Sequence, residues 1–82
     1  MRLYGKVLHG GVIVSHNVAF QIDGDKQIWT GCFTHSRQGA FSEGQKISLA
    51  FDGCKAVEAL VTRQDISPGC IVTHFDGNEP LP

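Results

Sequence analysis

The sequence lacks the features that define several large classes of protein. No apolar run approaches the ~20 residues of a membrane-spanning helix, and the first residues do not show the basic and then apolar pattern of a signal peptide. An excess of one charge is also missing, because seven basic and eight acidic residues give a net charge of −1. Proteins that bind duplex DNA usually carry a strong basic excess. We therefore expect no membrane partner and no duplex DNA partner.

Cysteine is scarce, and its spacing forms no pairs. Cys32, Cys54 and Cys70 are an odd number and make no CxxC motif, whereas a secreted disulfide scaffold has an even and denser set. We expect reduced thiols that belong to the core of a cytoplasmic protein.

Two cysteine–histidine pairs are candidates for zinc ligands, but their spacing argues against a shared ion. Cys32 and His35 are three residues apart, which on a strand places their side chains on opposite faces. Cys70 and His74 are four apart, and on a strand that separates them by about 13 Å. Zinc needs its sulfur and nitrogen ligands gathered around one point. We expect no metal and no other cofactor.

The strongest structural signal is an alternation of apolar and polar residues over Val12–Ile22. One face consists of five apolar side chains and a histidine: Val12, Val14, His16, Val18, Phe20 and Ile22. A period of two is typical of a half-buried strand. Eleven residues at about 3.3 Å each would span roughly 35 Å, which is long for a strand. We expect one strand that bends at residues 15–17, or two short strands that share a core face. His16 then lies in a turn or hydrogen-bonded in the core, with a binding role at the bend as the alternative.

Further strands and turns predict an all-β chain. Strand-like segments cover residues 2–9, 27–34, 45–51, 55–63 and 70–75, and Gly10-Gly11, Asp23-Gly24 and Asp52-Gly53 are hairpin signals. Residues 55–63 also contain helix formers, which leaves a short helix as the alternative there. Six or seven short strands with frequent turns predict one small six- to seven-stranded antiparallel barrel over 1–77, followed by a frayed C-terminal tail at 78–82.

The residues give no specific support for catalysis. Acid–base catalysis needs titratable groups that converge in a pocket, whereas most of the carboxylates here lie in predicted turns, where turn preference explains them. We expect a non-catalytic protein. Trp29 and Phe33 share one face of a predicted strand, and as an alternative to core residues they could form a stacking platform for single-stranded nucleic acid.

The second half of the chain carries a series of family motifs. Residues 34–39 keep the serine and the last glycine of a D/N-x-S-x-x-G turn, with Thr34 in place of the acid or amide. Residues 44–51 then match a G-x-x-v-x-l-x-f strand, and residues 59–63 and 69–75 correspond to two final strands. Through these motifs, the segment from Gly31 to Gly77 resembles the C-terminal part of PilZ domains, which are small β-barrels that bind cyclic di-GMP.

The other PilZ motif, R-x-x-x-R, has its nearest match at residues 2–6, with Lys6 in place of the second arginine. A guanidinium can bind phosphate through two parallel hydrogen bonds, and an ammonium cannot. The resemblance implies a PilZ-like binding or adaptor module with cyclic di-GMP as its ligand, bound weakly or no longer bound. The implied ligand-binding residues are Arg2, Lys6, Ser36, Arg37 and Gly39.

Two other interpretations stay open. An OB-like or SH3-like barrel fits the same strand pattern, and in that case Trp29 and Phe33 would bind single-stranded nucleic acid. Alternatively, the protein is a structural or interaction module that forms a homodimer, or pairs with a protein partner, through a strand edge left open by the bend at residues 15–17.

Overall fold

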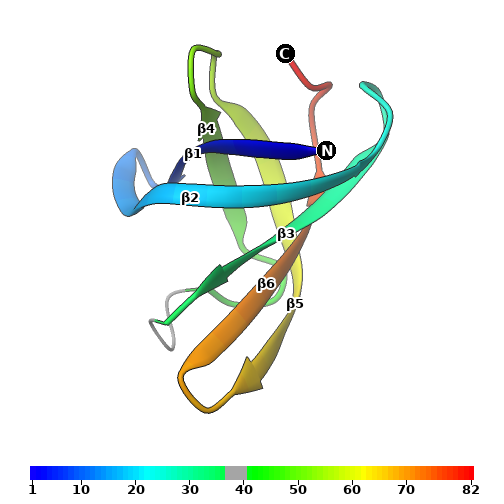
Figure 1. Cartoon of the computed structure of the whole chain (residues 1–82). Coiled ribbons are helices and arrows are strands. Elements are labelled where there is room, and N and C mark those ends of the chain that lie inside the picture. Colours follow the sequence, from blue (N-terminus) through cyan, green and yellow to red (C-terminus); the bar gives the residue numbers. More distant parts are fainter. Residues whose placement is uncertain (37–40) are drawn as a thin grey trace.

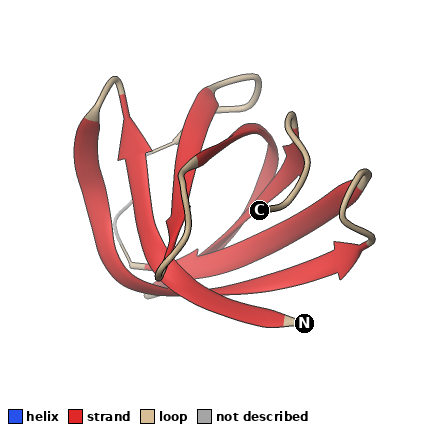
Figure 2. Cartoon of the chain, turned by 90° about the horizontal axis from the view of Figure 1, so that it is seen from above, coloured by secondary structure: helices blue, strands red, loops and turns tan. Residues whose placement is uncertain are grey.

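A computed structural model describes residues 1–36 and 41–82 of the chain. The described residues form six strands and no helix: β1 (Arg2–His9), β2 (Val12–Gly24), β3 (Trp29–His35), β4 (Lys46–Phe51), β5 (Val57–Ser67) and β6 (Cys70–Gly77). The strands close into one barrel in the order β1-β2-β3-β6-β5-β4, and every neighbouring pair is antiparallel (Figure 1). Seen from above in Figure 2, the strands curve round into one closed sheet. The all-β barrel is confirmed, and the segment with helix formers is strand β5.

Strand β3 begins two residues later than the sequence predicts, because Asp25 organises the preceding turn. Its Oδ1 accepts hydrogen bonds from the backbone N–H groups of Ile28 and Gln27, each at 2.8 Å. Such local bonds compete with strand pairing. They also stabilise the charged carboxylate, so that first the bond from Ile28 and then that from Gln27 hold the pKa of Asp25 below its usual value.

Aromatic rings fill the closed part of the barrel. The side chain of Phe20 is fully buried, and its ring meets those of Phe33, Phe51 and Phe75 edge to face at centroid distances of 5.6, 5.4 and 6.2 Å. Trp29 packs against two of the same rings, Phe51 and Phe75. These contacts join four strands, β2, β3, β4 and β6, around one point. Edge-to-face pairs add to the energy of apolar burial.

Strand β2 bends at the residues that the sequence indicates, and the bend changes which side chains face the core. On β1, Gly5 and Val7 are two residues apart, but their partners Val18 and Ser15 on β2 are three apart. Asn17, between them, has a φ of 52°, so the strand contains a β-bulge. A second bulge follows in β2. Val7 and Leu8 are adjacent on β1, but their partners Ser15 and Ile13 are two residues apart. The predicted bend is therefore confirmed.

The prediction that Val12 belongs to the core is wrong. Val18, Phe20 and Ile22 are buried as predicted, and Val14 packs against the core, but Val12 is 64% exposed. The alternation of apolar and polar residues runs without interruption across the bend. Each extra residue in a bulge, however, moves the side chains that follow it to the other face of the strand.

Two glycines allow elements to approach closely in this barrel. A Cβ on Gly5 would collide with the carbonyl oxygen of Ala50 on β4, and a Cβ on Gly77 would collide with the indole ring of Trp29. The seam between β1 and β4 and the packing of Trp29 against β6 therefore both need a residue without a side chain.

Residues 78–82, expected as a frayed tail, lie against the barrel. The carbonyl of Glu79 accepts a hydrogen bond from Trp29 Nε1 at 2.7 Å, and Leu81 N donates to the carbonyl of Lys26 at 2.8 Å. Leu81 also packs against the core. The buried indole N–H needs an acceptor, and the tail supplies it.

The Phe20→Ala variant tests the aromatic core. We expect it to lower the free energy of unfolding by about 3–5 kcal/mol, because the substitution removes buried apolar surface and leaves a cavity. A chemical denaturation curve measures this change. The control is Gln21→Ala, which alters the exposed neighbour on the opposite face. If Gln21→Ala proved the costly change and Phe20→Ala lay within about 1 kcal/mol of wild type, the register of β2 described here would be wrong.

Candidate ligand-binding groove

A groove opens where β2 and β3 separate. The two strands pair only from Phe20 with Phe33 to Gly24 with Trp29, because the bulges turn the first half of β2 away from β3 (Figure 1). The space between them measures about 600 Å³, within the usual range of about 300–1,000 Å³ for small-molecule sites. We call it the β2–β3 groove. Its lining comes from Arg2, Val14–Ala19, Gln21 and 32–36.

The lining of the β2–β3 groove combines apolar and polar side chains, and its formal charge is positive. It contains one guanidinium, two imidazoles, two amides and several hydroxyls: Arg2, His16, His35, Asn17, Gln21, Ser15, Thr34 and Ser36. No carboxylate belongs to the lining among the described residues. A guanidinium together with neutral donors suits an anion, because hydrogen bonds from charged donors to anionic oxygens are the strong ones.

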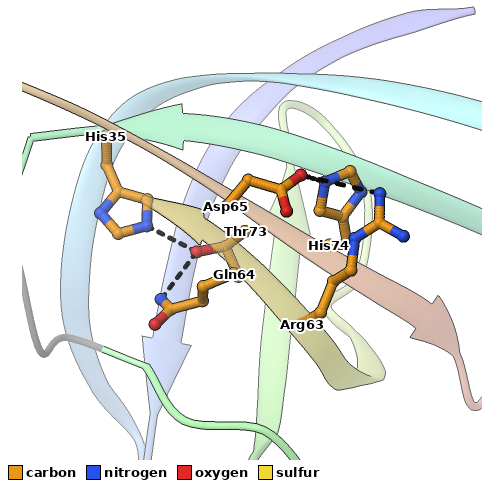
Figure 3. A network of polar contacts seen from close by, with 6 residues as sticks. All are labelled: His35, Arg63, Gln64, Asp65, Thr73 and His74. Atoms are coloured by element: carbon orange, nitrogen blue, oxygen red, sulfur yellow. Dashed lines mark hydrogen bonds and ion pairs between the residues drawn. The ribbon is translucent and has the colours of Figure 1, made fainter. Parts of the chain in front are cut away.

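A buried hydroxyl orients one side of the groove. Thr73 on β6 is fully buried, and its Oγ1 lies 2.6 Å from His35 Nε2 and accepts a hydrogen bond from Gln64 Nε2 at 3.0 Å (Figure 3). The ring of His35 also packs against those of Phe33 and Phe41, with centroids 5.3 and 5.2 Å away. These contacts hold the imidazole of His35 in one orientation at the wall of the groove.

A second polar cluster lies on the outer surface of the barrel. His74 Nε2 is 2.8 Å from Asp65 Oδ2, and Arg63 Nη2 is 3.6 Å from the same oxygen (Figure 3). The side chains of Arg63 and Asp65 are more than half exposed, and ion pairs so open to solvent contribute little to stability. Cys32 pairs with His74 in the register of β3 and β6, so this cluster borders the β2–β3 groove at Cys32.

The structure brings together two of the five ligand-binding residues that the resemblance implies. Arg2 and Ser36 both line the β2–β3 groove. Lys6 is exposed on β1, opposite Ala50 of β4, and does not line the groove. Arg37 and Gly39 lie outside the described residues, directly after Ser36 in the sequence.

Several residues of the groove do not follow from sequence reasoning. Gln21 lies between two apolar residues of a strand, and Asn17 lies between a histidine and a valine. Polar side chains at such positions of a strand usually face solvent. Only the positive φ of Asn17 marks its position as special, since asparagine tolerates the left-handed conformation better than most residues. His16 is exposed at the bend and lines the groove, which excludes a core histidine and fits both the turn interpretation and the binding alternative.

Two further predictions concern the cysteines and a metal site. Cys32, Cys54 and Cys70 are free, but the prediction that they belong to the core is wrong, since Cys54 is exposed and the other two are half-buried. Over residues 1–36 and 41–82, no three or more His, Cys, Asp or Glu side chains are gathered so that they could hold a metal ion.

Trp29 and Phe33 both point into the core and are buried. They therefore present no open ring face on which a base could stack. In the part of the chain that the structure describes, there is also no helix with the length and apolarity needed to cross a membrane.

The chain was compared with known proteins. No family model, no curated protein and no solved structure matches it. The fold itself places the protein in the class of small, closed, six-stranded antiparallel β-barrels.

The Thr73→Val variant tests the hydroxyl beside the groove. Valine keeps the shape of threonine but removes the acceptor of the half-buried Gln64 amide, and a typical hydrogen bond contributes about 0.5–1.5 kcal/mol. We expect a decrease of that size in the free energy of unfolding, measured by chemical denaturation. Thr34→Val, at an exposed position on β3, is the matched control and should stay near wild type. Equal effects of the two variants would contradict the role of the Thr73 hydroxyl.

Proposed function

We propose that this protein is a non-catalytic binding module, similar to PilZ domains, and that its ligand occupies the β2–β3 groove. The observation that supports the proposal most is the common location of Arg2 and Ser36, which line the same groove. Arg2 belongs to the R-x-x-x-R-like segment and Ser36 to the D/N-x-S-x-x-G-like turn. The two motifs are far apart in the sequence, and one residue of each lines this groove.

The chemistry of the groove supports an anionic ligand with several hydrogen-bonding groups, and cyclic di-GMP is the first ligand to test. The guanidinium of Arg2 can bind a phosphate through two hydrogen bonds. The hydroxyls of Ser36 and Thr34 and the amides of Asn17 and Gln21 can bind the polar edges of a base or sugar. Because no described carboxylate lines the groove, no lining group opposes an anion by like charge.

A binding role also fits the composition of the groove better than catalysis by paired carboxylates does. General acid–base work by paired carboxylates needs at least one such group in the pocket, and the described lining has none. We also propose a cytoplasmic location, which the odd number and the wide spacing of the three cysteines support.

Calorimetric titration with cyclic di-GMP tests the proposal. We expect binding that weakens as salt concentration rises, because the main charge contact is between Arg2 and a phosphate. Arg2→Ala should weaken binding by about 1.5–3 kcal/mol, the usual value of a hydrogen bond to a charged group.

Lys6→Ala is the matched control, since it removes a cation from the same strand outside the groove. Binding should be nearly unchanged in that variant. An absence of heat at millimolar nucleotide would contradict the nucleotide proposal. An equal loss in the Arg2 and Lys6 variants would contradict the location of the site.

A further inference from the structure

The first half of β2 has an edge that no other strand covers. Between Val12 and Ala19, β2 pairs with β1 on one side, and its pairing with β3 begins only at Phe20. Among the described residues, no strand pairs with the other side of β2 from Val12 to Val18. The backbone N–H and C=O groups on that side therefore face the open space of the β2–β3 groove. An open edge of this kind is a template for pairing with another strand.

This edge lacks most of the devices that protect natural strand edges. No charged residue and no proline occurs from Gly10 to Ile22, although lysine, other charges and proline commonly protect edges. Val12 is 64% exposed and Ile13 is 40% exposed. The bulges are the protection that remains. The second bulge lies at Val14, so regular pairing is limited to the two short stretches beside it, Val12–Ile13 and Ser15–His16.

We propose that a second copy of this chain pairs with this edge, antiparallel and about a twofold axis near Val14. Such an interface uses the same segment from both copies, which is the usual arrangement in a homodimer. The charges permit it, because the two edges carry no formal charge and the whole chain carries only −1. Pairing forms a continuous β1-β2-β2-β1 sheet across the dimer and removes the exposed Val12 and Ile13 from water.

The size of the interface sets the expected strength. Stable dimers usually bury about 1,600 Å² in total, and a strand of five or so residues buries less than that. The dimer should therefore dissociate in the high micromolar range. Gln21 of the groove, which pairs with Arg2 on β1 and with Cys32 on β3, lies outside the segment that would pair with the second copy. The dimer therefore does not depend on the proposed ligand, and each can fail without the other.

Sedimentation equilibrium of the ligand-free full chain, from micromolar to millimolar concentration, tests the dimer. We expect the mean mass of the wild type to rise toward twice that of the monomer. Val12→Lys replaces an apolar side chain of the edge in each copy with a charge, one of the devices that protect natural edges, and should raise the dissociation constant about tenfold or more. The matched control is Ile28→Lys, since Ile28 is 79% exposed in the β2–β3 turn, far from the β1–β2 turn (Figure 1). Its dissociation constant should equal that of wild type.

Amide hydrogen exchange identifies the surface used. In the wild type, the groove-facing amides of Val12–His16 should exchange more slowly as concentration rises, and in Val12→Lys they should not. Circular dichroism confirms that both lysine variants are folded. A wild type that stays monomeric at millimolar concentration would overturn the proposal. So would equal effects of the two lysine variants, or a dimer that leaves these amides unprotected.

Discussion

The arrangement of this barrel depends on strand β2, which pairs with two neighbouring strands along one half and with only one along the other half. From Phe20 to Gln21 the strand is paired with β1 on one side and with β3 on the other, whereas from Val12 to Ala19 it is paired with β1 alone. The change occurs at the bulge that contains Asn17, whose positive φ redirects the chain. The paired half closes the barrel, and the other half forms one wall of the β2–β3 groove. The candidate site and the open edge therefore have one structural cause.

The interior is aromatic where β2 is paired on both sides and contains a hydrogen-bonded hydroxyl where β2 and β3 separate. Where β2 is paired on both sides, the rings around Phe20 fill the barrel and exclude polar groups. Where the strands separate, the hydroxyl of Thr73 instead bonds to Gln64 and His35. A buried hydroxyl is tolerated there because its hydrogen-bonding partners are present. The aromatic part buries apolar surface, and the polar part orients a side chain of the groove.

Sequence reasoning predicts the fold well, because it depends on local signals. Apolar alternation and turn residues are enough to place all six strands and to favour a barrel, and Arg2 and Ser36 can be selected from motifs that resemble a known family. The exposure of Val12 could not be predicted, since a bulge shifts the faces of a strand without altering the apolar pattern. The contribution of Asn17 and Gln21 to the groove could not be predicted either. It depends on how far two strands diverge, which is a property of the closed sheet.

The division of β2 is tested most directly by hydrogen exchange of its individual amides, measured by NMR at a concentration too low for dimers. Amides from Phe20 to Ile22 should all exchange slowly, because strands or the first residue of the chain pair with this segment on both sides. From Val12 to Asn17, amides that face β1 should exchange slowly and those that face the groove should exchange fast. Uniformly slow exchange along the whole strand would contradict the account, because it would mean that another part of the same chain covers this edge.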